Sequence, residues 1–357
     1  MNVYSQAKRL LFRLEPERAH DLVMGGLALA SRSAALPRLM AMTRGAPDPR
    51  LAVEAFGLRF PNPLGLAAGL DKDGVAFPAL AALGFGAVEV GSVTALPQPG
   101  NARPRLFRLV EDEALVNRMG FNNAGAAALA ARLARLDRGR VPGVVLGVNV
   151  GKSRVARAES AADDYRAALG EVWRVADYLT LNVSSPNTPG LRALQRTEPL
   201  LALLRVAAEL RTELGAKPVL VKLAPDLSDD EIAELVEAAE RGGAAGLIAT
   251  NTTLARAELA SPHRTQEGGL SGRPLARRAL RVLELVRART QLPVVAVGGI
   301  AGPADALDRF RAGADLLQLY TSFVYRGPRV VTDVLAGLSA ELDRRGLGAV
   351  RELKGRV

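Results

Sequence analysis

Amides, hydroxyls, lysines and glycines stand directly after short apolar runs along the 357-residue chain. The richest of these positions is the segment 182–187, which reads Asn-Val-Ser-Ser-Pro-Asn. The others are Gly69 to Lys72, Gly91-Ser92, Asn149, Lys222, Thr250 to Thr252, Gly298-Gly299 and Tyr320-Thr321. A single cluster of this kind is ordinary capping of a strand end. Eight clusters in the same position relative to the apolar runs indicate a shared site.

The amides and lysines suggest what such a site would bind. The asparagines near these positions are Asn117, Asn122, Asn149, Asn182, Asn187 and Asn251. Each amide offers both a donor and an acceptor, so several together suit a planar ligand with imide-like edges, such as a pyrimidine or a flavin. The alternative is that single asparagines only form turns. Lys72 and Lys222 stand out because only six of the 47 basic residues are lysine.

Glycines near the end of the chain predict an anion site. Gly298-Gly299 leads to Gly302-Pro303, and proline suits the first position of a helix. Helix N-termini present free N–H groups to anions. If Tyr320-Thr321 closes the last strand of a barrel, this is also the usual place for a barrel phosphate site. We therefore expect a phosphorylated cofactor or substrate.

The elements that position these residues follow a regular rhythm after residue 46. Short runs rich in β-branched residues alternate with amphipathic segments, which predicts repeated βαβ units. The runs are 64–69, 87–93, 144–151, 178–185, 218–225, 246–252, 293–299 and 316–321. Eight of them predict a (β/α)8 TIM barrel, whose active site lies at the C-terminal ends of the strands. We expect the long segment 97–121 to be a functional loop and the stretch from Gly346 to be a solvated tail.

Residues 1–45 differ from the barrel domain, which we place at 46–357. They predict one or two short helices with an apolar face, and seven basic residues outnumber three acidic ones. Two interpretations remain open at this point: a helical cap packed on the barrel, or interfacial helices on an anionic membrane surface. The longest uncharged run there, 22–31, is about half the length that a bilayer requires.

Composition excludes several classes of site. The chain has no cysteine, so disulfides, zinc–thiolate sites and cysteine catalysis are excluded, and we expect no metal site. The net charge of +10 is compatible with nucleic acid. However, the basic residues are scattered and aromatic residues make up only 4% of the chain, so we expect no nucleic-acid partner.

Three motifs then identify a family by resemblance. They read AAGLDK at 67–72, NRMGFNN at 117–123 and NVSSPNTPGLR at 182–192, and they resemble dihydroorotate dehydrogenase, the FMN enzyme of pyrimidine biosynthesis. The resemblance covers nearly the whole chain in the correct order. It implies a flavoprotein oxidoreductase that acts on a CH–CH bond, oxidising (S)-dihydroorotate to orotate with FMN as cofactor.

The resemblance also implies roles for individual residues. Ser185 would be the base that removes a proton from dihydroorotate. The implied FMN contacts are Ala68, Gly69, Leu70, Asp71, Lys72, Ser92, Asn149, Asn182, Lys222, Thr250, Gly272, Gly299, Tyr320 and Thr321. The implied substrate contacts are Lys72, Asn117, Arg118, Met119, Gly120, Phe121, Asn182, Asn187, Asn251 and Thr252. Alternative roles are a surface ion pair with Asp71 for Lys72 and a rim lysine for Lys222.

Ser185 separates the two branches of the family. The soluble branch carries a cysteine as base in the equivalent loop, whereas the quinone-linked branch uses serine and has an N-terminal helical extension on the membrane. The resemblance therefore favours the membrane interpretation of residues 1–45, with His20 and Arg108 facing a membrane quinone. It places the protein peripherally on the cytoplasmic face of a bacterial inner membrane.

Other interpretations predict different behaviour. A soluble dihydroorotate dehydrogenase would pass electrons to fumarate or a nicotinamide. Another FMN- or phosphate-binding barrel, such as an isomerase, would not be reduced by dihydroorotate. A non-catalytic scaffold on the membrane surface would hold no flavin.

Overall fold

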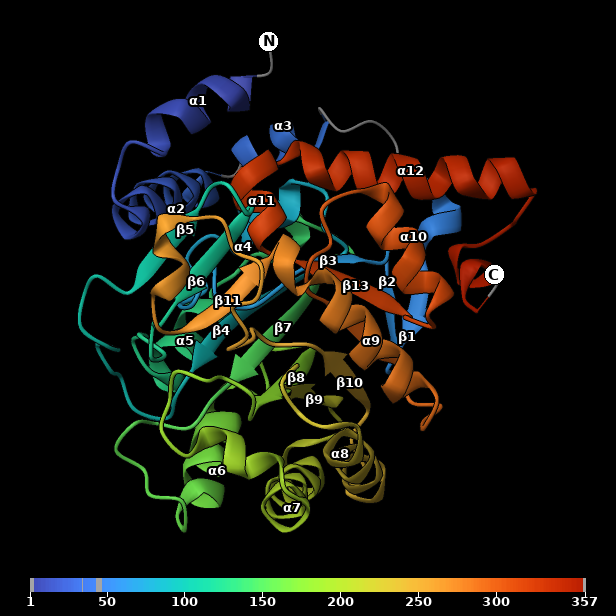
Figure 1. Cartoon of the computed structure of the whole chain (residues 1–357). Coiled ribbons are helices and arrows are strands. Elements are labelled where there is room, and N and C mark those ends of the chain that lie inside the picture. Colours follow the sequence, from blue (N-terminus) through green and yellow to red (C-terminus); the bar gives the residue numbers. More distant parts are fainter. Residues whose placement is uncertain (1–2, 34, 43–46, 356–357) are drawn as a thin grey trace.

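The computed structural model describes residues 3–33, 35–42 and 47–355. Within these residues, eight parallel strands close into a barrel, which confirms the predicted fold (Figure 1). The barrel strands are β3 (Leu64–Leu66), β4 (Ala87–Val93), β7 (Val145–Val150), β8 (Tyr178–Asn182), β9 (Val219–Leu223), β10 (Gly246–Ala249), β12 (Val294–Val297) and β13 (Leu316–Leu319). Pairing of β13 with β3 completes the closure.

Most of these strands are shorter than the predicted runs because the polar or glycine residues at their ends leave the sheet. The run from Leu64, for example, stops pairing after Leu66, and Gly69 adopts a φ of +113°. The strand residues themselves are almost entirely buried, as expected for a sheet covered on both faces. The apolar run therefore marks the strand, and the residues beyond it form the rim.

Helices surround the barrel and follow its strands in the chain (Figure 1). They are α4 (Phe77–Ala82), α5 (Ala126–Leu133), α6 (Ala161–Val172), α7 (Thr197–Leu214), α8 (Asp229–Arg241), α9 (Ala276–Arg287), α10 (Pro303–Arg311), α11 (Thr321–Arg326) and α12 (Arg329–Arg345). Helix α8 shows how the sequence specifies them. Ser228 and Glu231 form a capping box at its start, and Ile232, Leu235 and Val236 are buried at helical spacing.

The predicted functional loop 97–121 contains an antiparallel hairpin. Its strands β5 (Leu106–Leu109) and β6 (Ala114–Asn117) pair with each other, and β6 also pairs with β11 (Gly269–Gly272) from much later in the chain. This small sheet has its own buried cluster, which includes Phe107, Val116 and Leu270. The insertion is thus a folded unit beside the barrel (Figure 1).

A second hairpin, which the sequence did not reveal, packs at the opposite end of the barrel. Its strands are β1 (Val53–Ala55) and β2 (Leu58–Phe60). The ring of Phe56 lies 6.4 Å from that of Tyr178, at the start of β8, and 6.2 Å from that of Phe60. The hairpin therefore covers the N-terminal ends of the strands.

The N-terminal extension forms helices α1 (Val3–Leu11), α2 (Pro16–Arg32) and α3 (Leu36–Met42), one more than the upper number predicted. Helix α1 packs on α11, and α2 packs on α4 and β5. Many of their apolar side chains nevertheless stay exposed: Leu10, Leu14, Leu22, Val23, Leu29, Leu36, Leu39 and Met42. In the described ranges, no helix has the length and apolar character to cross a bilayer.

The prediction of a solvated C-terminal tail was wrong. Residues 350–353 form a 3-10 turn whose Val350 and Leu353 side chains are buried. Lys354 forms an ion pair with Asp315 at 2.5 Å, and the turn packs against α10 and α12. The segment from Gly346 is rich in charged residues, and this hid the two apolar side chains, three residues apart, that are buried.

Leu353→Ala should therefore destabilise the fold by about 2–5 kcal/mol, because truncating a buried leucine leaves a cavity. Chemical denaturation measures this loss. Arg351→Ala in the same turn is the matched control, since its side chain is exposed, and it should change stability by less than about 0.5 kcal/mol. Equal stability of the two variants would contradict the packing described here.

Candidate active site

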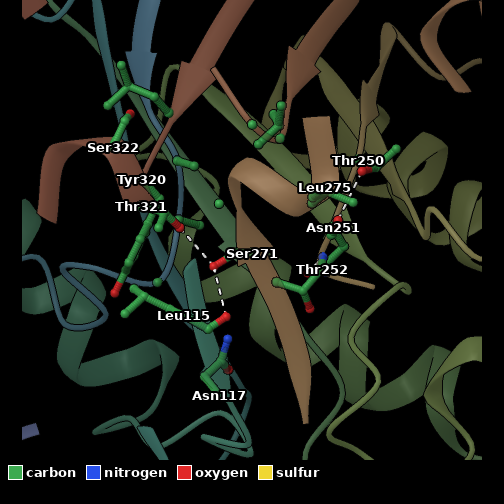
Figure 2. Close-up of a pocket in the computed structure, with 18 of the residues that line it drawn as sticks. Leu115, Asn117, Thr250, Asn251, Thr252, Ser271, Leu275, Tyr320, Thr321 and Ser322 are labelled. Carbon is green, nitrogen blue, oxygen red and sulfur yellow. Dashed lines mark hydrogen bonds between the residues drawn. The ribbon is translucent and has the colours of Figure 1, made fainter. Parts of the chain in front are cut away.

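A pocket opens at the rim formed by the C-terminal ends of the barrel strands. The small β5–β6–β11 sheet forms its opposite wall, through residues such as Leu115 and Asn117 (Figure 2). The predicted site residues in the wall are His20, Ala68, Gly69, Lys72, Ser92, Asn117, Met119, Gly120, Phe121, Asn182, Ser185, Asn187, Lys222, Thr250, Asn251, Thr252, Gly272, Gly299, Tyr320 and Thr321. The fold thus brings residues from across the chain into one cavity.

Buried amides and hydroxyls form a hydrogen-bonded chain along the pocket floor. The Asn182 amide donates to Ser92 Oγ at 2.8 Å and to Asn149 Oδ1 at 3.0 Å. Its oxygen accepts from the Asn251 amide at 3.2 Å and from Ser184 Oγ at 3.3 Å. Ser92 Oγ in turn donates to Asn149 Oδ1. The ends of neighbouring strands are therefore held by side chains as well as by the sheet.

Ser185 lies in the loop after β8 and is 7% exposed. Its Oγ accepts the backbone N–H of Asn187 at 3.3 Å. The Asn187 amide donates to Asn117 Oδ1 at 3.2 Å, which ties this loop to the end of β6. Among the described residues, the Ser185 hydroxyl has no histidine or carboxylate partner, so any base chemistry must use another proton acceptor.

Lys72 lines the pocket without pairing with its sequence neighbour. The Asp71 carboxylate instead accepts the backbone N–H groups of Val75 at 2.9 Å and Ala76 at 2.8 Å. The alternative of a surface ion pair between these two residues is therefore wrong. Burial lowers the pKa of Lys72 below its usual value, and the negative charge of Glu17 opposes this shift. An anionic group in the pocket would raise the pKa of the lysine again, because it favours the charged form.

Lys222, at the end of β9, is 5% exposed and also lines the pocket. Burial lowers its pKa, and the charge of Glu89 opposes the shift. The alternative of a lysine extending from the rim into solvent is wrong, because the side chain is buried.

Glycines create close-packed backbone at the far end of the pocket. Gly299 has a φ of +71°, and a Cβ there would lie 2.3 Å from Ala276 Cα. A Cβ on Gly272 would lie 2.4 Å from the carbonyl oxygen of Glu113. Larger residues are excluded at both positions, so this wall of the pocket is formed by backbone.

Hydroxyl groups complete this end of the pocket. Thr321 Oγ1 and Ser271 Oγ lie 2.8 Å apart (Figure 2). Ser322 Oγ is buried and, among the described residues, has no hydrogen-bond partner. A buried hydroxyl of this kind is normally satisfied, so its state here fits a ligand with acceptor oxygens, such as a phosphate.

The helix predicted after Gly298-Gly299 does begin with Pro303, and the two backbone N–H groups just before it are already hydrogen-bonded. The Asp305 carboxylate accepts from the N–H of Ala301 at 2.8 Å and of Gly302 at 3.1 Å. The N–H groups of Ala301 and Gly302 are therefore not free to bind an anion, whereas the glycine and hydroxyl residues around the pocket line its wall.

An ion pair attaches the N-terminal helices to the site. Glu17 in α2 is 2% exposed and accepts hydrogen bonds from Arg105, which is 5% exposed, the shortest at 2.7 Å. Burial by itself raises the pKa of Glu17, but the hydrogen bonds and charges of Arg105 and Arg103 outweigh burial and lower it. Three residues along the same helix, His20 lines the pocket. Burial and the nearby Lys72 charge lower its pKa to about 4, so its ring is neutral at physiological pH.

Five predicted contacts lie outside the pocket wall: Leu70, Asp71, Arg108, Arg118 and Asn149. The guanidinium of Arg108 binds the carbonyls of Phe12 at 3.0 Å and Leu14 at 2.9 Å, so it fixes the turn between α1 and α2. The Arg118 side chain turns toward Gln266, at 3.2 Å.

Sequence analysis also missed residues that line the pocket: Leu106, Leu115, Ser271, Leu275, Ile300 and Tyr325. Several come from the β5–β6–β11 sheet or the turn after it. The signal that was available is Gly268-Gly269-Leu270-Ser271-Gly272, a glycine-rich segment between β10 and α9 that a simple βα unit does not need.

The fold and the site together define a TIM-barrel protein with a polar, glycine-lined ligand pocket at the usual catalytic rim. A family model described as dihydroorotate dehydrogenase matches residues 50–342. The chain therefore belongs to the dihydroorotate dehydrogenase family, which confirms the resemblance found in its motifs.

Similar proteins share nearly the whole chain. A protein of Halobacterium salinarum named dihydroorotate dehydrogenase (quinone) is 49% identical, with 99% of both chains covered. One of Deinococcus deserti with the same name is 50% identical, with 98% of both covered. A crystal structure of DHODH from Eimeria tenella in complex with ferulenol has a TM-score of 0.87 at 38% identity, with 95% of both chains covered.

Proposed function

We propose that this protein oxidises (S)-dihydroorotate to orotate in de novo pyrimidine biosynthesis, with FMN as cofactor and a membrane quinone as electron acceptor. The main support is the pocket itself, where a serine, several amides, the partly buried Lys72 and the buried Lys222 lie beside a glycine- and hydroxyl-lined end. The relatives named as quinone enzymes are similar to this chain over nearly its full length, including the N-terminal helices. A soluble enzyme of the same family is the second candidate.

The residues present fit FMN. The phosphate would bind at the end of the pocket where Gly272, Gly299, Thr321 and the unpartnered Ser322 hydroxyl lie together. Bound at these residues, FMN would supply a hydride acceptor for the substrate and an electron donor for the quinone. The ammonium of Lys222 would stabilise negative charge that develops on the bound ring.

The substrate would occupy the part of the pocket between the barrel rim and the β6 end. Lys72 would pair with the carboxylate of dihydroorotate, which offsets the cost of burying the ammonium. Asn117, Asn187 and Asn251 would bind the polar edges of the ring, because each amide offers a donor and an acceptor. The backbone of residues 119–121 would close this space.

Ser185 would remove the substrate proton. The Asn187 N–H already donates to Ser185 Oγ, and this hydrogen bond would stabilise the oxygen as it loses its own proton. That proton must leave through Thr188, which is 7% exposed three residues further on, or through an ordered water. Serine needs such a relay because it is intrinsically a weak base.

The N-terminal helices would bring the quinone to the site from the cytoplasmic face of a bacterial inner membrane. Exposed apolar side chains on α1 to α3 suit an interfacial position, and the basic excess in residues 1–45 suits an anionic membrane surface. His20 would contact the quinone at the inner end of this route. Arg108 would support the route by holding the α1–α2 turn rather than by direct contact.

The visible spectrum of the purified protein tests the activity. We expect the absorbance of a bound flavin, its loss on anaerobic addition of dihydroorotate, and its recovery on addition of a quinone. Recovery with fumarate or a nicotinamide and not with a quinone would favour the soluble enzyme. A flavin that dihydroorotate does not bleach would exclude both candidates, and a protein without flavin would be a non-catalytic scaffold.

Ser185→Ala should slow flavin reduction by dihydroorotate by about 100-fold or more, the usual contribution of a positioned general base. Stopped-flow absorbance under anaerobic conditions measures this rate across pH. Thr212→Ala is a suitable control, because it also removes a hydroxyl but lies exposed on α7, outside the pocket lining. If reduction by Ser185→Ala kept the wild-type rate at every pH, Ser185 would not be the base.

His20→Ala should slow reoxidation of the flavin by a quinone by about tenfold, equivalent to about 1.4 kcal/mol, with flavin reduction by dihydroorotate unchanged. Substitution is a cleaner test than deletion of residues 1–45, which would leave Arg105 buried without Glu17. Because His20 has a pKa of about 4, reoxidation in the wild type should show no histidine titration between pH 5 and 8. Unaltered reoxidation in the variant would remove His20 from the quinone route.

A further inference from the structure

A carboxylate lies deep in the barrel, and the mechanism above does not use it. Glu89 stands in the middle of the apolar strand β4 and is 1% exposed. Its Oε1 accepts from the Asn149 amide at 2.7 Å. Its Oε2 accepts from the Tyr178 hydroxyl at 2.9 Å and from the Gln318 amide at 2.8 Å. Burying a carboxyl group is costly unless it is hydrogen-bonded, and here both of its oxygens accept hydrogen bonds.

The carboxylate fixes the direction of the first amide above it. Both oxygens of Glu89 accept hydrogen bonds, and the Asn149 atom that faces Glu89 is the nitrogen. The oxygen of the same amide is therefore turned upward, where it accepts from Ser92 and from the Asn182 nitrogen at 3.0 Å. No other orientation of Asn149 satisfies both neighbours.

The same constraint passes to the next two amides. With its nitrogen held by Asn149, Asn182 presents its oxygen to the Asn251 nitrogen at 3.2 Å. The Asn251 nitrogen is also bound to Ser184 Oγ at 2.9 Å, so both of its hydrogens are used. Its oxygen accepts the Thr252 N–H at 2.8 Å and retains a second lone pair. Asn251 lines the pocket (Figure 2). The chain of amides therefore ends at the pocket wall in an oxygen that can accept one more hydrogen bond.

We propose that Glu89 is a positioning residue, whose acceptor-only carboxylate sets the direction of the amide chain through Asn149 and Asn182 to Asn251. The pocket thereby presents an acceptor to a ring N–H, which dihydroorotate and orotate both have. The inference rests on the proposed function for the identity of this ring. Glu89 itself does not touch the ligand.

The neighbours of Glu89 explain why a glutamine is not equivalent. Tyr178 and Gln318 both donate to one oxygen of the carboxylate, so a glutamine would keep its oxygen on their side. Its nitrogen would then face the Asn149 nitrogen. Two facing donors repel each other, so the Asn149 amide would have to rotate by about 180°. Its nitrogen would then face the Asn182 nitrogen, and the same clash of donors would pass along the chain to the pocket. Glu89→Gln thus reverses or disrupts the chain without changing the size of the side chain.

Exchanging the carboxylate at position 89 and the amide at position 149 tests the proposal. Asn149→Asp combined with Glu89→Gln again gives a donor facing an acceptor at this contact and again turns an oxygen toward Ser92 and Asn182. Each single variant should weaken orotate binding by at least about tenfold, and the double variant should recover to within about threefold of wild type. Isothermal titration calorimetry of orotate into the flavin-loaded protein gives these affinities, and flavin content and melting temperature are measured on the same samples.

Thr180→Val on β8 is the matched control, because Thr180 is fully buried, its hydroxyl has no partner among the described residues, and it is outside the amide chain. It should bind orotate like the wild type. Wild-type affinity in Glu89→Gln, or a double variant no better than the weaker single one, would overturn the proposal. If Glu89→Gln does not retain flavin, the orotate affinity of Asn149→Asp is compared with that of the double variant. The proposal then requires that the double variant bind orotate more tightly than Asn149→Asp does. A wild-type protein that does not bind orotate would instead refute the proposed function.

Discussion

The pairing of β13 with β3 is the constraint on which the rest of the structure depends. It brings together strands about 250 residues apart in the chain, with Leu317 opposite Leu64 and Gln318 opposite Gly65. A Cβ on Gly65 would lie 3.2 Å from the Gln318 side chain, so the absence of a side chain allows the close approach. Closure gives one continuous rim, and the polar strand ends become neighbours there because every barrel strand runs in the same direction.

The sequence was sufficient to predict the barrel because its signals are local. Each strand is a short apolar run bounded by glycine or polar residues, and closed parallel sheets require such runs. The hairpin β1–β2, the pairing of β6 with β11 and the buried turn at Val350 and Leu353 were not predicted. Their strands or turns are only three or four residues long, and long-range packing rather than periodicity decides their position.

The candidate site was predictable to a similar extent and for a related reason. Residues at strand ends reach the pocket because the fold places all such ends on one rim, and Asn182, Lys222 and Thr250 all line it. The direction in which a side chain points within a turn is harder to predict from the sequence. Asp71 and Lys72 are neighbours, yet one caps a backbone turn and the other enters the pocket. Glu89 escaped notice because an acidic residue inside an apolar run is evident only when its partners are seen.

Buried charge contributes to this structure mainly by specifying arrangement. A buried ion pair such as Glu17 with Arg105 gains little net stability over apolar packing, because desolvation offsets the attraction. Its geometry, however, is demanding. Arg105 also donates to the carbonyls of Pro99 at 2.6 Å and Asn101 at 2.8 Å, and Asn101 binds the Arg118 carbonyl at 2.8 Å, next to the pocket segment 119–121. An apolar contact would allow α2 to shift on the surface of the barrel. The hydrogen-bonded network instead fixes the position of α2 relative to segment 119–121 and keeps His20 at the pocket wall.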